Sequence, residues 1–211
     1  MTTTIYITRH GQTVWNTEKR MQGWSDSPLT ELGIQQARWL EERLKDTKLD
    51  AIYSSPINRA LSTANIMNSK RNIPLYTDLR LKEINMGIWE GLTQDEIQKS
   101  YSKELYNFWN VPQLYNPYDG ETFYQIRQRT EEFIKEIISK NIGKDILIVT
   151  HTITLKAIMS FFQNTLIEDF WGPPFIHPTS LTAVRAENEN FKVLLNADTS
   201  HLKDLKEVKA I

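Results

Sequence analysis

Apolar residues along this chain follow two different spacings. Short and nearly continuous apolar runs predict buried strands, whereas apolar residues that recur every three or four positions predict amphipathic helices. Strands are expected at 4–8, 49–53, 74–78, 145–150, 180–186 and 191–195, the last two as an antiparallel hairpin closed by residues 187–190. Helices are expected at 30–45 with Thr30 as N-cap, and at 57–69, 93–101, 121–140 and 153–162.

The order of these elements predicts the fold class. Strands alternate with helices along most of the chain, which favours a largely parallel sheet covered by helices on both faces. We therefore expect an α/β protein with a three-layer α/β/α sandwich, formed as a single domain by residues 1–211. Residues from about 84 to 120 are less regular, and we expect them to form a small cap-like insertion over the carboxyl ends of the strands.

Composition narrows the classes of function. The chain has 211 residues and a formal net charge of −1, which gives no bulk electrostatic case for a nucleic-acid or anionic-membrane partner. It contains no cysteine, which excludes disulfides, thiolate metal clusters and a cysteine-based phosphatase mechanism. Neither a signal-peptide pattern nor an apolar run approaching ~18 residues is found, so we expect a cytoplasmic protein.

Three of the predicted strands end in polar clusters. These clusters are Arg9-His10-Gly11 with Asn16, Ser54-Ser55-Pro56 with Arg59, and Thr150-His151-Thr152. Parallel strands bring their carboxyl ends to one edge of a sheet, where open α/β folds bind ligands. Two guanidiniums, two imidazoles, an amide and two helix N-termini would then surround one point. Such a set of donors suits a phosphoryl group, because it reaches several oxygens at once.

The chain resembles the histidine phosphatase superfamily, the phosphoglycerate-mutase-like group, over nearly its whole length. The matching motifs are Thr8-Arg9-His10-Gly11 with Asn16, the 22–30 loop, Ser54-Ser55-Pro56 with Arg59-Ala60, Leu81-Lys82-Glu83 with residues 87–91, and Val149-Thr150-His151. Residues 196–202 resemble the closing motif of the phosphatase branch. The family resemblance implies the same sandwich architecture that the periodicity predicts.

The resemblance also implies a role for each matching residue. His10 would be the nucleophile that forms a phosphohistidine, and Glu83 would protonate the leaving oxygen and then activate water. Oxygens of the phosphate and substrate would be contacted by Arg9, Asn16, Gln22, Gly23, Arg59, His151 and Thr152. Thr152 stands where the family usually has glycine, which we expect to narrow the range of substrates. No metal and no cofactor is expected, because the cationic side chains supply the charge.

The leading interpretation is therefore a metal-independent phosphomonoester hydrolase acting on small phosphorylated metabolites, as a monomer or a homodimer. A phosphoglycerate mutase is an alternative, although family mutases carry a longer and more basic insertion after the catalytic glutamate. A catalytically weak phospho-ligand-binding protein is a second alternative. Glu90, Asp95 and Glu121 are alternative acids to Glu83. Trp24, Trp89 and Trp109 are expected near the mouth of the site, and His177 and His201 are expected to be structural.

Overall fold

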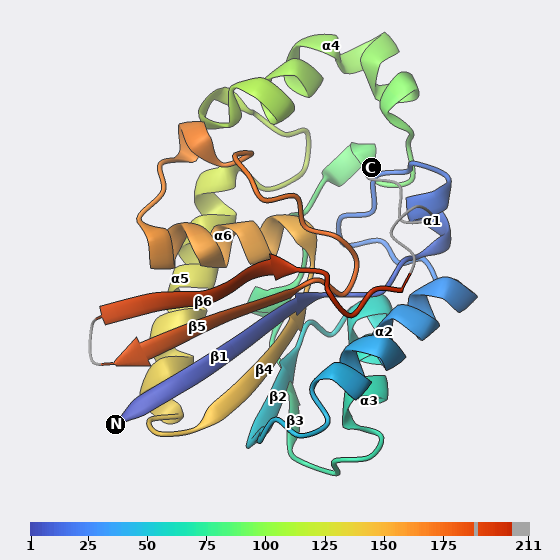
Figure 1. The fold of residues 1–211 in the computed structure, drawn as a ribbon. Coiled ribbons are helices and arrows are strands. Elements are labelled where there is room, and N and C mark those ends of the chain that lie inside the picture. The colour runs from blue at the N-terminus through green and yellow to red at the C-terminus, as the bar shows by residue number, and fades with distance from the viewer. Residues whose placement is uncertain (188–189, 204–211) are drawn as a thin grey trace.

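A single six-stranded sheet forms the centre of the protein, with the strand order β3-β2-β4-β1-β5-β6 (Figure 1). The computed structural model describes residues 1–187 and 190–203. The strands are β1 (Thr2–Arg9), β2 (Ala51–Ser54), β3 (Leu75–Thr77), β4 (Asp145–Thr150), β5 (Leu181–Glu187) and β6 (Asn190–Asp198). The pairings β3-β2, β2-β4 and β4-β1 are parallel, whereas β1-β5 and β5-β6 are antiparallel. The predicted mostly parallel sheet and its antiparallel closing strands are thus confirmed, and turn residues 188–189 lie outside the described part.

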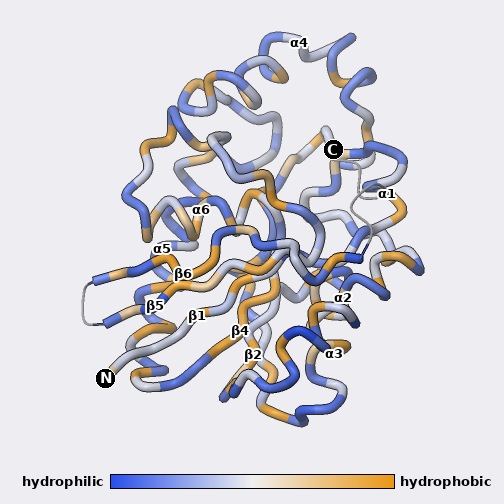
Figure 2. The backbone as a smooth tube through the Cα atoms, in the orientation of Figure 1, coloured by the Kyte–Doolittle hydropathy of each residue, from blue (hydrophilic) through white to orange (hydrophobic). Residues whose placement is uncertain are grey.

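Helices cover both faces of the sheet. One face packs against α2 (Glu31–Arg43) and α3 (Asn58–Asn68), and the other packs against α5 (Phe123–Lys140) and α6 (Thr152–Gln163). Strand β4 lies between these two helical layers, so both of its faces are buried. Its sequence is accordingly apolar almost throughout (Figure 2). Its residues Ile146 and Ile148 belong to the core beneath α5 and α6, and Leu147 and Val149 belong to the core beneath α2 and α3. This alternation is the period of two expected for a strand between two layers.

The predicted cap region contains more helix than the sequence pattern suggested. Helix α4 runs over Gln94–Asn110, nine residues beyond the predicted end at residue 101, with a break in helical geometry at Tyr101 (φ −135°, ψ 37°). The second half of α4 is held in place by Leu105 and Phe108, which are buried in a third apolar cluster. That cluster joins the cap to the first turns of α5 and α6 through Phe123, Ile126 and Ile153.

Short elements complete the described chain. Helix α1 (Val14–Thr17) was not predicted; it is a single turn in which Thr13 and Asn16 form a reciprocal capping box. Four 3₁₀ turns lie at Leu79–Leu81, Gly87–Trp89, Pro112–Leu114 and Ile167–Asp169. Within residues 1–187 and 190–203, none of the helices combines the length and the apolar character needed to cross a membrane.

Candidate active site

Three adjacent parallel strands deliver the predicted polar clusters to one edge of the sheet. Arg9 at the end of β1 pairs in register with Thr150 at the end of β4, and the backbone N–H of His10 donates to the Thr150 carbonyl at 2.9 Å. On the other side of β4, the N–H of Ser55 donates to the Val149 carbonyl at 3.0 Å. The neighbouring strand ends therefore place His10, Ser55 and His151 together, as the sequence predicted.

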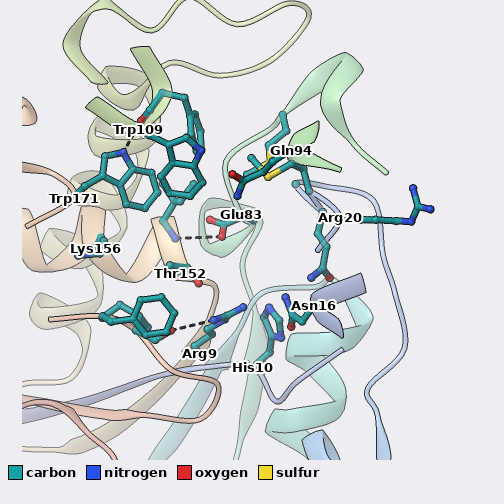
Figure 3. A pocket seen from close by; sticks show the side chains of 18 of the residues that line it. Arg9, His10, Asn16, Arg20, Glu83, Gln94, Trp109, Thr152, Lys156 and Trp171 are labelled. Atoms are coloured by element: carbon teal, nitrogen blue, oxygen red, sulfur yellow. Dashed lines mark hydrogen bonds between the residues drawn. The ribbon is translucent and has the colours of Figure 1, made fainter. Parts of the chain in front are cut away.

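His10 has one ring nitrogen fixed and the other facing an open cavity. The Nδ1 atom lies 2.7 Å from the Gly11 carbonyl, which only accepts hydrogen bonds, so Nδ1 carries the proton in the neutral ring and Nε2 carries the lone pair. Burial, followed by the positive charges of Arg59 and Arg9, lowers the pKa of His10 well below its usual value of 6.5. At neutral pH the ring is thus uncharged, with an unprotonated Nε2 on the cavity side (Figure 3).

His151 lies behind His10 and is fully buried. The two ring centroids are 5.2 Å apart in an edge-to-face arrangement, and the Nε2 of His151 is 2.8 Å from the Ser55 hydroxyl. Burial and the charge of Arg59 lower the pKa of His151 well below 6.5. Its Nδ1 has no hydrogen-bond partner among residues 1–187 and 190–203. His151 is not one of the residues that line the cavity, so it supports the floor of the site from below.

Two buried arginines supply fixed positive charge. The Arg59 guanidinium is 1% exposed and donates to the carbonyls of Gly23 and Ser25, both at 2.7 Å, and to Asp26 at 3.3 Å. Arg9 donates from Nη1 to the Ile176 carbonyl at 3.0 Å. Burial lowers the pKa of Arg9 to about 10, so its guanidinium remains protonated at neutral pH. In the described part of the chain the Nε atoms of both arginines have no partner, which leaves each guanidinium with unused donor capacity.

The 22–26 loop is clamped from two sides. Glu90 accepts hydrogen bonds from the backbone N–H groups of Trp24 at 2.7 Å and Ser25 at 2.8 Å, opposite the carbonyls that Arg59 holds. Gly23 has a φ of +53°, which favours glycine, and a Cβ there would lie 2.2 Å from a Glu90 carboxylate oxygen and displace that side chain from the loop. Gln22 and Gly23 both line the cavity, and their contact with substrate stays a prediction.

Asn16 has its amide orientation set by the α1 cap. The Thr13 N–H donates to its Oδ1 at 3.0 Å, so the Nδ2 group is the end left to serve as a donor. Asn16 lines the cavity beside His10. Its predicted side-chain donor is therefore available at the site.

Glu83 reaches the site from the irregular segment before the cap. Its Oε1 accepts from the backbone N–H groups of Ile84 at 3.0 Å and Thr154 at 3.1 Å. Its Oε2 accepts from the N–H of Ile153 at 3.2 Å, which leaves that oxygen the less occupied of the two. Glu83 lines the cavity, whereas the alternative acids Glu90, Asp95 and Glu121 do not.

The two helix N-termini expected to face a bound anion instead face carboxylates of the protein. The first free N–H groups of α6 point to Glu83, and the N–H of Arg59 in the first turn of α3 points to Asp26 at 3.3 Å. This corrects the expectation from sequence. Internal carboxylates occupy these positions because a helix N-terminus attracts any nearby negative group.

The cavity above His10 has a volume of about 540 Å³ and a largely apolar wall (Figure 3). Its apolar lining comes from segments far apart in the chain: Met21, Met86, Phe108 and Trp109 of α4, Ile153 of α6, and Trp171, Pro173, Pro174, Phe175 and Ile176. Trp109 lies in the wall as expected. Trp89 is 1% exposed and belongs to the cap core, and Trp24 donates from Nε1 to the Glu83 carbonyl at 2.8 Å without lining the cavity.

Several lining residues were not predicted from the sequence. They are Arg20, Gln94 and Lys156, together with the 171–176 segment. Arg20 bonds to Glu18 at 2.8 Å, and Lys156 donates to the carbonyls of Gly172 at 2.6 Å and Pro174 at 3.2 Å. The Thr152 side chain also lines the cavity, at the first position of α6. Across the described ranges, no group of three or more carboxylate or imidazole side chains is arranged to hold a metal ion.

Comparisons with known proteins show the family to which the chain belongs. A family model described as "Histidine phosphatase superfamily (branch 1)" matches residues 5–199, and the chain belongs to that superfamily. The solved structure of Bacillus stearothermophilus YhfR is similar with a TM-score of 0.93 and 45% identity, covering 95% of this chain and 100% of that one.

Two curated relatives carry different activities in their names. Phosphoserine phosphatase 1 of Hydrogenobacter thermophilus is 28% identical over 168 residues, which is 80% of each chain. A protein of Yersinia pestis named "Probable phosphoglycerate mutase GpmB" is 32% identical over 159 residues, which is 74% of this chain and 73% of that one. Both phosphatases and mutases are therefore among the relatives of this chain.

Proposed function

We propose that the protein is a phosphomonoester hydrolase that acts through a phosphohistidine at His10. The observation that carries this proposal is the state of that ring. A neutral imidazole, with its proton held on Nδ1 by the Gly11 carbonyl and its Nε2 lone pair toward the cavity, is a nucleophile ready to attack. Arg9 and Arg59 lie close enough to depress its pKa, so they also lie close enough to attract a phosphate dianion.

The first chemical step forms the phosphoenzyme. His10 Nε2 attacks phosphorus, the ester P–O bond breaks, and its electron pair moves to the leaving oxygen. That oxygen takes a proton from the Glu83 carboxyl group, for which Oε2 is the better placed atom. The products of this step are the free alcohol, a phosphorylated His10 and a Glu83 carboxylate.

The second step returns the enzyme to its first state. Water attacks phosphorus while Glu83 accepts a water proton, the P–N bond breaks, and its electron pair returns to Nε2. Arg9 and Arg59 stay charged throughout and stabilise the equatorial oxygens, Asn16 adds a hydrogen-bond donor, and His151 supports His10 from below the cavity. Because these side chains supply the positive charge, the proposed mechanism has no step that uses a metal ion or cofactor.

The cavity wall supports a preference among phosphate esters. Beyond the charged floor, the wall presents Phe108, Trp109 and Trp171, which suit an apolar or aromatic leaving group. We therefore infer a small phosphorylated metabolite with an apolar alcohol portion as the favoured substrate class. A cytoplasmic location fits a chain without cysteine.

Mutase activity remains the alternative that the Yersinia relative suggests. A mutase must also bind the carboxylate of phosphoglycerate, so it needs further cations around the site. Among the residues that the structure describes, the lining cations other than Arg9 and Arg59 are Arg20, which is paired with Glu18, and Lys156, which is bonded to two carbonyls. This shortage of unengaged cations favours transfer to water.

The test combines turnover with trapping of the intermediate. Hydrolysis of p-nitrophenyl phosphate should persist in excess EDTA and be inhibited by vanadate, and rapid acid-free quenching with ³²P-labelled substrate should trap label on His10. His10→Ala should abolish both turnover and labelling, while His201→Ala, which lies outside the cavity, should retain both. Strict metal dependence, or label on another residue, would disprove the mechanism. Interconversion of 2- and 3-phosphoglycerate faster than hydrolysis would establish the mutase instead, and phosphate-ester binding without turnover would establish the phospho-ligand-binding protein.

A further inference from the structure

The segment that carries Glu83 is neither helix nor strand beyond residue 81, yet its backbone is held at nearly every carbonyl. Two threonine hydroxyls donate at 2.7 Å, Thr150 to the Leu81 carbonyl and Thr154 to the Lys82 carbonyl. Arg129 donates to the carbonyls of Arg80 and Glu83, and the Trp24 indole N–H also donates to that of Glu83. The Asn85 carbonyl accepts from the backbone N–H of Glu121. A segment without regular structure gains its fixed shape from such side-chain bonds.

One arginine accounts for two of these contacts. Arg129 of α5 donates from Nη1 to the Arg80 carbonyl at 2.5 Å and from Nη2 to the Glu83 carbonyl at 2.9 Å. Its guanidinium is oriented by a two-point ion pair with Glu121, with Nε–Oε1 at 2.8 Å and Nη2–Oε2 at 3.0 Å. The planar fork therefore holds a carboxylate and two carbonyls in one fixed arrangement, which a flexible ammonium could not reproduce.

Glu121 holds the segment from the other side of Glu83. Its Oε2 accepts from the N–H of Asn85 at 2.8 Å, and its own N–H donates to the Asn85 carbonyl at 2.8 Å. The ion pair of Arg129 and Glu121 thus grips the chain at residues 80, 83 and 85. Neither member lines the cavity, and their side chains are only 16% and 17% exposed.

We propose that Arg129, oriented by Glu121, is a positioning residue that fixes where the Glu83 carboxyl group stands above His10. The proposal rests on the role of Glu83 as the proton donor given above. The N-terminus of α6 holds the Glu83 carboxylate, and Arg129 holds the carbonyl of the same residue, so both ends of the residue are fixed. Proton transfer requires heavy atoms within about 2.6–3.2 Å, and a displacement of about 1 Å can reduce the rate about 100-fold.

Leaving-group dependence separates positioning of the acid from general damage. An alkyl phosphate must receive a proton as its P–O bond breaks, whereas p-nitrophenolate leaves without one. Arg129→Met should therefore reduce kcat/KM for an alkyl phosphate by about 10- to 100-fold, with a loss of about threefold or less for p-nitrophenyl phosphate. The kcat/KM value reports the phosphorylation step, in which Glu83 acts as an acid.

Matched variants make the test decisive. Arg127→Met removes a cation from the same helix without touching the 80–85 segment, and should leave both substrates at wild-type kcat/KM. Arg129→Lys should restore part of the alkyl phosphate activity. Glu83→Gln should show the same selectivity as Arg129→Met but more strongly, by roughly 100- to 10,000-fold on the alkyl phosphate.

The outcomes distinguish the two levels of the proposal. If Glu83→Gln reduces both substrates equally, the role of Glu83 as acid is wrong. If Glu83→Gln is selective but Arg129→Met is not, the positioning role of Arg129 is overturned and the mechanism stands. Should Arg129→Met fail to fold, as judged by circular dichroism, Glu121→Gln keeps the helix start and loosens the guanidinium, and must show the same selectivity in milder form.

Discussion

Acid should destabilise this protein through its two active-site histidines. His10 and His151 are buried, and each has a pKa well below 6.5, mainly because burial penalises the charged ring and then because Arg59 is near. In the unfolded chain each imidazole titrates near about 6.5. Below that pH the unfolded state binds two more protons than the folded state, so the free energy of unfolding falls as the pH falls.

The size of the effect follows from proton linkage. Each histidine that is protonated only when unfolded contributes about 1.4 kcal/mol of lost stability between pH 7.5 and 5.5. The pair therefore contributes about 2.7 kcal/mol over that range. Carboxylates titrate mostly below pH 5.5 and add little there, while His177 and His201, whose pKa values are also lowered by burial, add an amount common to all variants.

The assay is urea unfolding at pH 7.5, 6.5 and 5.5, in buffers free of phosphate because a bound anion would stabilise the folded state. His10→Asn keeps an N–H for the Gly11 carbonyl but cannot titrate, and it should lose about 1.4 kcal/mol less than wild type on acidification. His151→Asn should show the same smaller loss of unfolding free energy on acidification. The double variant should lose about 2.7 kcal/mol less than wild type. A His10→Asn protein with an unchanged pH dependence would refute the depressed pKa.

Three further predictions test packing around the site. Phe108→Ala, at a fully buried ring that contacts five other aromatic side chains, should cost about 3–5 kcal/mol of unfolding free energy, measured in urea. Gly33→Ala would place a Cβ 2.0 Å from the carbonyl oxygen of Gln12, two residues after His10, and should lower the unfolding free energy by about 1–3 kcal/mol and also lower kcat/KM. Gly172→Ala is the control, because its Cβ would lie 3.1 Å from the Asp169 carbonyl oxygen, a looser contact. Trp109→Ala should raise KM about 2- to 10-fold for phenyl phosphate but not for glycerol phosphate, since an aromatic contact contributes about 0.5–1.5 kcal/mol; equal changes for the two substrates would contradict an aryl-binding wall.

The floor of the site was predictable because its residues directly follow strands. Arg9 and Thr150 are the last residues of β1 and β4, and His10 and His151 follow them directly, so the parallel order of the sheet alone brings them together. The start of α2 was equally readable, since Thr30 caps it as predicted. Local pattern and register were sufficient in these places.

The wall of the site could not be predicted from strand ends and local pattern. It combines α4 with the 171–176 segment, and no periodicity links positions so distant in the chain. The second half of α4 was missed because its helix depends on burial of Leu105 and Phe108 against α5 and α6, which is tertiary information. Arg129 was missed because a charged residue on a long amphipathic helix resembles any solvated one until its carbonyl partners are known.

The aromatic rings of the cavity wall have a consequence for how this enzyme can change. Phe108 and Trp171 face the cavity, and both also pack against Phe123 in the interior. A substitution at either ring that changes the part of the cavity available to the alcohol portion of the substrate therefore also removes buried packing around Phe123. Divergence toward new esters is coupled to a loss of thermodynamic stability, so laboratory evolution of this chain should begin from a thermostabilised parent.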